Sequence, residues 1–443
     1  MLISFEVKNF MSFYKKTKFS MEASKGTRLR EHVVPEKKYN LLKSAFIFGA
    51  NASGKTNFIK AIDFLRKLVV DGFDSTKIDK KFYRINKNAM YEDGFFSVEF
   101  SSNGDIFKYE ISFSYLSRVI KTEKLCLKKG TKSVVLFDRC VSDDKIKINT
   151  DYKFISQEDR FRFDVYVKDY AESENSGLNQ VLFLRDVALR SSSNSQYFKC
   201  YINALKWFLS ILIIFPNTKF GNIIKMIEAP EKSDAIKEAL EKLDTGITGV
   251  AKKVVDYEKV FNSFKEEENK DFMDKLIKDL DKHPLMMKIE NAVVTFEKNE
   301  DDSIIASKMQ LEHGNSEDLF DYMDESDGTQ RLFDLIPVFI SSHSDRLIII
   351  DEIDRSLHTK LTRKLVEIFF QNNTYNNSQL IVSSHDCNLM DLDLLRQDEI
   401  WFVNKGIEGE SNLISLKEFK VRFDKKILKE YFEGVFGGVP KLE

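Results

Sequence analysis

The spacing of apolar residues separates predicted strands from predicted helices along the chain. The short run Ala45–Phe48 is apolar throughout, as in a strand buried on both faces. Helical spacing follows between Thr56 and Val70, where apolar side chains recur every three or four residues, at Phe58, Ile59, Ile62, Leu65 and Val69. Gly49 ends the strand, so the pattern predicts a buried strand, a glycine-containing turn and an amphipathic helix.

Strand and helix patterns alternate through the rest of the chain. Strand patterns are predicted from about 95 to 150, and apolar and polar residues alternate again at 285–312. Helices are predicted from about 178 to 215 and at 232–243, and a charged helix at 264–283. Apolar strands are predicted within 346–354, 379–386 and 399–403. The most apolar run is 207–215 (WFLSILIIF). It is far shorter than the ~18–20 residues that span a bilayer, so we interpret it as a buried core helix.

These patterns predict an α/β protein in three parts. A β-rich lobe with the glycine turn covers 1–150, a helical or mixed insert covers 151–300, and a second lobe covers 301–443. The length of 443 residues suggests about three domains of ~150 residues, or one large α/β domain that carries insertions. Hydrophobic residues make up 42% and charged residues 31%, which excludes a mainly disordered chain.

Charge and cysteine usage narrow the class of protein further. Lys and Arg number 68 against 70 Asp and Glu, which excludes a uniformly basic nucleic-acid-coating protein. Residues 1–60 are basic and 301–360 acidic; solvated surfaces explain both, and the functional alternative is a basic surface open to nucleic acid or an acidic partner. The four cysteines are widely spaced and form no CxxC pair, as is usual in a reducing cytoplasm. The sequence also shows no signal-peptide pattern, so we expect a cytoplasmic protein.

Residues 49–56 (GANASGKT) match the phosphate-loop pattern GxxxxGK[ST]. Its glycines let backbone N–H groups turn inward around phosphate oxygens, and the following helix adds a partial charge of about +0.5 at the anion. We expect Lys55 to reach the β- and γ-phosphates and the Thr56 hydroxyl to coordinate Mg²⁺. A chance glycine-rich turn is the alternative, and the strand before the loop and the helix after it argue against that.

Two further strand ends carry candidate chemistry. Asp351 ends an apolar strand and could hold Mg²⁺ through water, while Glu352 is placed to polarise the attacking water. His385 ends the next strand and could contact the γ-phosphate. Acids or a histidine at a strand end are commonly structural, but beside a phosphate loop they favour an ATP site.

A second helix N-terminus follows the segment 325–331 (ESDGTQR). Ser326 can cap this helix, and Gly328 allows close backbone approach. An ordinary helix cap is the alternative, and taken alone it is the better interpretation.

The order of these motifs resembles the ABC-class ATPases of the SMC/RecF type. GANASGKTN at 49–57 resembles their phosphate loop, and ESDGTQR at 325–331 their signature, although Asp327 replaces the first glycine of the usual Ser-Gly-Gly. DEIDRSLH at 351–358 is similar to their Asp-Glu strand and D-loop, and SSHD at 383–386 to their switch histidine. YFEGVFGGVP at 431–440 resembles the tail of a bacterial AAA-type subgroup that includes ATPase subunits of antiphage and abortive-infection systems (RloA, AbiL, AriA and PtuA types).

The resemblance implies an ABC-type ATPase head with a mixed β lobe, a parallel phosphate-loop sheet and a helical insert. Two heads would sandwich ATP and Mg²⁺, with Ser326 and Gly328 acting in trans and Asp354 in the D-loop. Glu352 and His385 would be the catalytic residues, and Thr56 and Asp351 the Mg²⁺ ligands. The remaining ATP contacts would come from the phosphate loop, at Gly49, Asn51, Ser53, Gly54, Lys55, Thr56 and Asn57.

Some features depart from the family pattern. The interval 151–300 has no sustained heptads, so no long coiled coil is expected. The glutamine that senses Mg²⁺ in this class is either Gln157 or Gln180. Only 58 residues follow His385, too few for the TOPRIM nuclease domain of OLD-type relatives, and Asp391–Asp393 is expected to be structural.

Three functional hypotheses follow. The first is an ATPase of a bacterial antiphage system that forms a homodimer or a larger even-numbered oligomer around ATP and controls a separate effector, a nuclease, without membrane association. The second is a RecF-like repair or loading ATPase that binds DNA. The third is a scaffold that binds ATP but barely hydrolyses it, and the presence of Glu352 argues against it.

Overall fold

The computed structural model describes the chain apart from residues 27, 74–75, 131, 143–144, 172–179, 193, 219–225, 227–228, 257–279, 281–284, 290–291, 300, 316, 341–344, 375, 420, 422–426 and 440–443. The predicted helix at 264–283 lies almost wholly outside the described residues. The chain forms two compact units: a core unit of 1–215, 344–353 and 377–443, and a second unit of 216–343 and 354–376. Each unit joins distant segments, and the three-part division by chain order stays a prediction.

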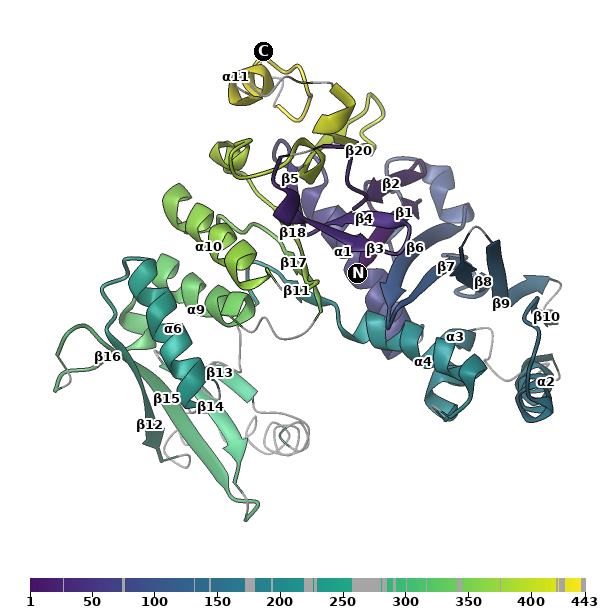
Figure 1. The fold of residues 1–443 in the computed structure, drawn as a ribbon, viewed down its shortest axis with the longest axis horizontal. Helices are drawn as coiled ribbons and strands as arrows, with labels where there is room; N and C mark the ends of the chain where they lie inside the picture. Colours follow the sequence, from purple (N-terminus) through teal and green to yellow (C-terminus); the bar gives the residue numbers. More distant parts are fainter. Residues whose placement is uncertain are drawn as a thin grey trace. The chain divides into compact units, whose positions relative to one another are not determined.

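The core unit contains a seven-stranded antiparallel sheet (Figure 1). In spatial order its strands are β10 (Lys145–Asn149), β9 (Lys132–Ser142), β8 (Ile120–Lys129), β7 (Asp105–Phe113), β6 (Gly94–Ser102), β1 (Leu2–Lys8) and β2 (Thr17–Ser20). Apolar side chains alternate with polar ones along β7, where the apolar side chains are buried and the polar ones partly exposed. The predicted strands between 95 and 150 are confirmed.

The second sheet of the core unit positions the phosphate loop. Its order is β11 (Leu212–Ile214), β17 (Leu347–Ile350), β18 (Gln379–Ser383), β5 (Ser44–Phe48), β19 (Ile400–Lys405) and β20 (Ser411–Ser415). All neighbours are parallel except β19 and β20. The central strands are buried along their whole length, which explains their unbroken apolar runs.

The interpretation of 207–215 as one buried helix is wrong. Helix α4 (Gln196–Leu209) ends at its cap Ser210, and Leu212–Ile214 form strand β11, parallel to β17. The β-branched Ile213 and Ile214 favour a strand, and the pairing with β17 extends the sheet by one edge strand.

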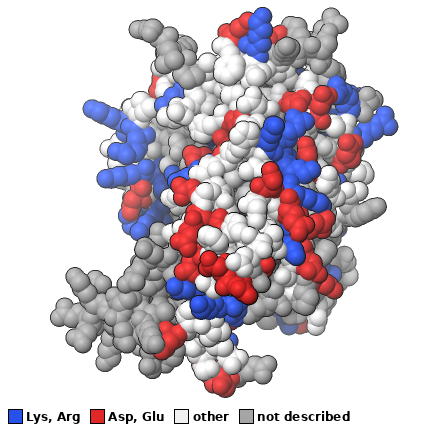
Figure 2. Space-filling view, turned by 90° about the vertical axis from the view of Figure 1, so that its left-hand side faces the viewer, with Lys and Arg blue, Asp and Glu red and all other residues white. Residues whose placement is uncertain are grey.

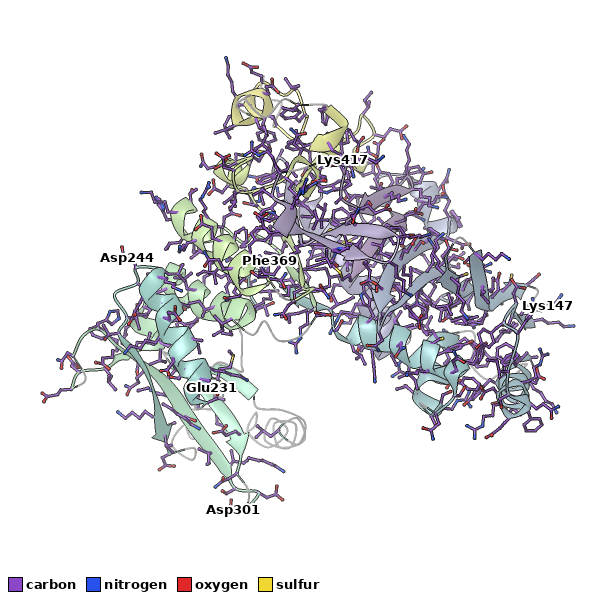
Figure 3. All side chains as sticks on the ribbon, in the orientation of Figure 1. Lys147, Glu231, Asp244, Asp301, Phe369 and Lys417 are labelled. Carbon is purple, nitrogen blue, oxygen red and sulfur yellow. The ribbon has the colours of Figure 1, made fainter. Side chains whose placement is uncertain are left out.

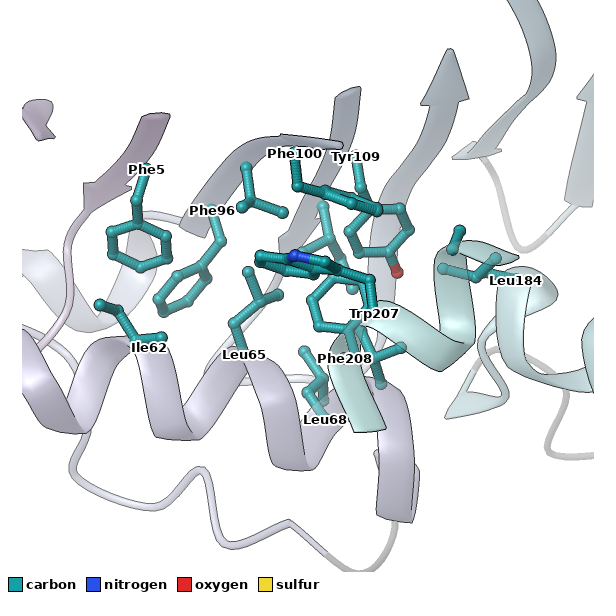
Figure 4. Close-up of a cluster of buried hydrophobic side chains, with 14 of the residues drawn as sticks. Phe5, Ile62, Leu65, Leu68, Phe96, Phe100, Tyr109, Leu184, Trp207 and Phe208 are labelled. Carbon is teal, nitrogen blue, oxygen red and sulfur yellow. The ribbon is translucent and has the colours of Figure 1, made fainter. Parts of the chain in front are cut away.

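Helix α1 (Lys55–Asp71) confirms the amphipathic helix predicted after the glycine turn, and it packs on the antiparallel sheet. Figure 4 shows Ile62, Leu65 and Leu68 of α1 facing aromatic side chains of β6 and β7, while α4 adds two more rings. Trp207 of α4 stacks on Phe100 with ring centroids 4.2 Å apart. Because α1 begins at the phosphate loop, this cluster fixes the helix that carries Lys55 and Thr56.

A buried ion pair attaches helix α3 (Phe183–Arg190) to the antiparallel sheet. The side chains of Glu123 and Arg139 are both fully buried, and Arg139 Nη1 lies 3.3 Å from Glu123 Oε2. The Glu123 carboxylate also accepts the N–H groups of Phe183 and Leu184, at 2.7 and 3.0 Å, where α3 begins. Since these N–H groups have no partner within the helix, the carboxylate serves as a cap supplied by the sheet.

The second unit is built on an antiparallel sheet of β12 (Gly249–Val255), β15 (Ile304–Glu312), β14 (Ala292–Lys298) and β13 (Leu285–Ile289), with β16 (Phe320–Asp321) paired to β15. Its described helices of more than three residues are α6 (Pro230–Lys242), α9 (Asp327–Ile340) and α10 (Thr359–Asn372), and α6 and α10 both pack on α9. Phe369 of α10, labelled in Figure 3, meets Phe339 of α9.

The remaining described elements lie outside these sheets and helices. They are α2 (Gln157–Ala171), α11 (Ile427–Phe432), β3 (Val33–Glu36), β4 (Tyr39–Leu42), and 3-10 turns at Arg30–His32, Lys87–Tyr91, Tyr322–Asp324, Cys387–Leu389, Gln397–Glu399 and Leu416–Phe419. The longest described helix is α1 with 17 residues, so the described part holds no long coiled coil, as predicted. No described helix is long and apolar enough to cross a membrane. On the face drawn in Figure 2, acidic and basic side chains are interspersed.

Candidate nucleotide site

The phosphate loop lies between β5 and α1, as its sequence context predicts. Gly54 precedes α1 with a φ of 121°, a conformation that favours glycine. Its Cα faces Ser411 and Ser12, and a Cβ there would lie 2.9 Å from Ser12 Oγ. Ser411 Oγ in turn donates to the Ser53 carbonyl at 2.5 Å. Ser411 of β20 and Ser12, which follows β1, therefore contact the phosphate loop at Ser53 and Gly54.

Lys55 lies inside the loop and next to His385. Its Nζ donates to the carbonyls of Gly49 and Ala50, at 2.7 and 3.2 Å, and lies 3.5 Å from His385 Nδ1. The Lys55 side chain is buried. The fold thus brings two residues 330 positions apart to the same end of the parallel sheet, where β5 and β18 both end.

Thr56 and Asp351 also lie together. The Thr56 hydroxyl donates to Asp351 Oδ1 at 3.3 Å, and Asp351 is 1% exposed at the end of β17. A hydroxyl and a carboxylate oxygen at this distance are hard ligands of the kind that Mg²⁺ binds together with water and phosphate. In the described part of the chain, no three His, Cys, Asp or Glu side chains form a metal-binding group.

Ser383 connects the two acids, a role that the sequence did not reveal. Its hydroxyl donates to Asp351 Oδ1 at 2.6 Å and accepts the N–H of Glu352 at 2.8 Å. Glu352 has a φ of 52°, in the left-handed region that few non-glycine residues adopt. The backbone of Glu352 is thus held in an uncommon conformation beside the Asp351 carboxylate.

The residues predicted to form the signature and the D-loop, Ser326, Gly328 and Asp354, belong to the second unit. Ser326 Oγ accepts the N–H of Thr329 at 3.2 Å, so Ser326 caps α9 as predicted. A Cβ at Gly328 would lie 2.6 Å from the carbonyl oxygen of Ser356, so this position admits only glycine without a shift. Asp354 begins the same D-loop, and its carbonyl accepts the N–H of Leu357.

A protein-family profile described as "AAA domain, putative AbiEii toxin, Type IV TA system" matches residues 44–153 and 143–391, more than half of the chain. The chain belongs to this AAA-domain family. No curated protein matches the sequence.

Solved structures similar to this AAA-domain protein include SMC heads. The crystal structure of the SmcHead bound to the C-winged helix domain of ScpA is 14% identical, with a TM-score of 0.45, covering 95% of this chain and 99% of that one. The SMC head domain from Thermotoga maritima is 12% identical, with a TM-score of 0.39, covering 94% of this chain and 98% of that one.

The loop of this AAA domain fits a phosphate group. Ser53 Oγ is buried inside the loop and has no hydrogen-bond partner among the described residues. Gly49, at the start of the loop, has a φ of 151°, and Asn51 is exposed near its tip. Asn57 in the first turn of α1 donates to Ser12 Oγ at 2.9 Å. A buried hydroxyl, the Lys55 ammonium and a helix N-terminus together suit a bound anion.

The two candidate glutamines of the AAA domain lie next to strands or loops of the antiparallel sheet. Gln157 begins α2, which packs on β10, and Gln180 donates to the Arg118 carbonyl at 3.2 Å. Which of them has a magnesium-sensing role stays open. Strand β11 ends level with β17 in the parallel sheet, because Ile214 pairs with Ile350.

Proposed function

We propose that the protein binds and hydrolyses ATP with Mg²⁺. The arrangement of Thr56, Asp351, Ser383 and Glu352 at one sheet edge, beside Lys55 and His385, is the observation that supports it best. Bound Mg²⁺ would neutralise charge on the phosphates, held by Thr56 and Asp351.

Each residue then has a distinct role. Lys55 exchanges its bonds to the loop carbonyls for phosphate oxygens, and the loop N–H groups bind the same anion. Glu352 orients a water and accepts its proton, and His385 donates a hydrogen bond to the terminal phosphate. The first test is ATP binding and phosphate release by the wild type and by Lys55→Ala. Loss of both activities in the variant supports the proposal, and equal activity contradicts it.

We further propose that two copies close around ATP, with Ser326 and Gly328 of one copy contacting the nucleotide of the other. The capped N-terminus of α9 supports this, because its N–H groups can bind a second face of the phosphates. Molar mass measured by light scattering tests it. An ATP-dependent doubling supports the composite site, and a monomer at saturating ATP contradicts it.

The cellular role that we propose is antiphage defence through a separate effector, a nuclease. The family description, which names a toxin of a type IV system, and the subgroup-like tail support this proposal. Tagged Glu352→Gln protein should be isolated from its host and its partners identified by mass spectrometry. A stoichiometric small protein with nuclease-like residues supports the proposal, whereas DNA without a protein partner favours repair.

A RecF-like DNA-binding role is the second candidate. A cavity of about 530 Å³ in the core unit supports it, since four lysines line it: Lys60, Lys67, Lys77 and Lys81. Asp63 and Asp71 also line the cavity, and Lys67 pairs with Asp63 at 2.7 Å, so the lysines outnumber the acids by two. Steeply salt-dependent DNA binding that Lys60→Glu and Lys77→Glu abolish would favour this role. Salt-independent or absent binding would count against it.

A further inference from the structure

The end of the described chain lies beside the phosphate loop. Tyr431 in α11 and Phe436 after it both stack on Phe402 of β19, with ring centroids 5.5 and 5.3 Å apart. All three rings are nearly fully buried. Asn404 Nδ2 donates to the Phe436 carbonyl at 3.2 Å. The segment 431–438, which we call the C-terminal clamp, is therefore fixed to β19 by side chains and backbone (α11 in Figure 1).

The clamp reaches the loop at Gly438. A Cβ on Gly438 would lie 3.3 Å from Gly49 Cα, the first residue of the phosphate loop. Behind Gly49, on β19, the Val403 carbonyl oxygen would lie 2.6 Å from a Cβ built on Gly49. Gly49 is thus enclosed by β19 and by Gly438, two backbones that leave it little space.

Tyr431 extends the contact toward the switch histidine. Its hydroxyl donates to the Gly438 carbonyl at 2.9 Å. Burial and a hydrogen-bonding contact with the Cys387 side chain raise the pKa of Tyr431 to about 12, so the hydroxyl stays protonated and able to donate. Cys387 lies two residues after His385, and its Sγ contacts the His385 carbonyl at 3.6 Å. One tyrosine thereby touches both the clamp and the segment that carries His385.

We propose that the C-terminal clamp is a positioning element of the nucleotide site, in which Gly438 supports Gly49 and Tyr431 links that support to the His385 segment. A glycine-rich loop loses much conformational entropy when it orders around an anion. A clamp that orders the loop beforehand lowers this loss and so strengthens phosphate binding. Its role in ATP binding rests on the proposed function, whereas its role in ordering the loop does not.

The test uses a matched pair of variants in the full chain. Gly438→Leu places a side chain against Gly49, and whichever backbone moves, the contact is lost. Gly434→Leu is the control, because Gly434 has nearly the same φ, 77° against 71°, and a Cβ there meets no atom within 4 Å. Tyr431→Phe keeps the ring stack and removes only the hydroxyl. Thermal unfolding of all three checks that each variant folds.

Two readouts separate this proposal from the proposed function. Hydrogen exchange of the peptide 46–58 without nucleotide reports loop order, and we expect Gly438→Leu to exchange about tenfold faster than Gly434→Leu. ATP titration should show an affinity about tenfold weaker in Gly438→Leu and weakened in the same direction in Tyr431→Phe, with kcat nearly unchanged. Equal hydrogen-exchange rates of the peptide 46–58 in Gly438→Leu and Gly434→Leu would contradict the proposed role of the C-terminal clamp. Faster exchange in Gly438→Leu, with no ATP binding by the wild type, would keep the clamp and overturn the proposed ATPase function.

Discussion

Ser383 Oγ donates a 2.6 Å hydrogen bond to Asp351 Oδ1, the same oxygen that accepts from Thr56. The hydroxyl also accepts the N–H of Glu352. One serine on β18 therefore fixes both acids at the end of β17. The pairing of Ile350 with Val382 places the two strand ends level with each other.

The first prediction concerns this serine. Ser383→Ala removes a hydrogen bond to Asp351, the carboxylate that we propose as a Mg²⁺ ligand, and the loss of such a bond weakens metal affinity about 10- to 100-fold. ATPase activity measured against Mg²⁺ concentration should show a half-saturation point raised to that extent. Ser415→Ala is the control, since Ser415 is fully buried on β20 of the same sheet and its hydroxyl donates to the Ile400 carbonyl, at 3.5 Å, away from the two acids. An unchanged Mg²⁺ dependence in Ser383→Ala would show that this bond does not position Asp351.

The second prediction concerns Gly328. In Gly328→Ala, a Cβ would meet the Ser356 carbonyl oxygen at 2.6 Å, so the first turn of α9 must shift. Each subunit should still bind ATP through its own Lys55 site, but the ATP-dependent dimer and hydrolysis should both be lost. Light scattering and phosphate release measure these. Gly314→Ala serves as the control for a general loss of stability, because its Cβ meets nothing within 4 Å while its φ of 76° strains the backbone. A Gly328→Ala protein that still dimerises would contradict a signature role for this turn.

The third prediction concerns the buried pair Glu123–Arg139. Arg139→Met leaves the Glu123 carboxylate buried without its cation, which should destabilise the protein by about 3–5 kcal/mol in urea unfolding. A surface pair such as Arg162–Glu158 should contribute less than about 1 kcal/mol when Arg162 is replaced. Equal effects of the two substitutions would contradict a structural role for the buried pair.

The pH dependence of the same pair gives a fourth prediction. Burial raises the pKa of Glu123 above its usual 4.5, and the Arg139 cation lowers it in part. Arg139→Met removes the lowering influence, so the carboxyl should bind its proton more readily in the folded state. Stability that depends on this proton is present at low pH and is lost as pH rises through the folded-state pKa. The destabilisation by Arg139→Met should therefore be smaller at pH 5 than at pH 8, and an equal or larger loss at pH 5 would contradict it.

How much the sequence predicts depends on how local each signal is. The β5 strand, the loop and α1 are adjacent in the chain, so their pattern and glycines predict them together. The prediction of a helix across 207–215 is wrong because an unbroken apolar stretch is equally compatible with a buried helix and a buried strand. The pairing of Leu212–Ile214 with β17 determines that these residues form a strand.

The residues that sequence reasoning missed act through distant contacts. Ser383 reaches Asp351 because β17 and β18 are in register, and nothing near Ser383 in the chain reveals this partner. Gly438 meets Gly49 across 389 positions. The sequence does single out its segment as a motif, but only the fold shows what it touches.

The most direct test of the central claim, hydrolysis with Glu352 as base, is a comparison of Glu352→Gln with the wild type under saturating ATP and Mg²⁺. General-base catalysis contributes about 10²–10⁴-fold, so phosphate release should fall by that factor. Glu352→Gln should keep bound ATP and accumulate as an even-numbered oligomer. A Glu352→Gln protein that releases phosphate as fast as the wild type would contradict the assigned base and the mechanism built on it.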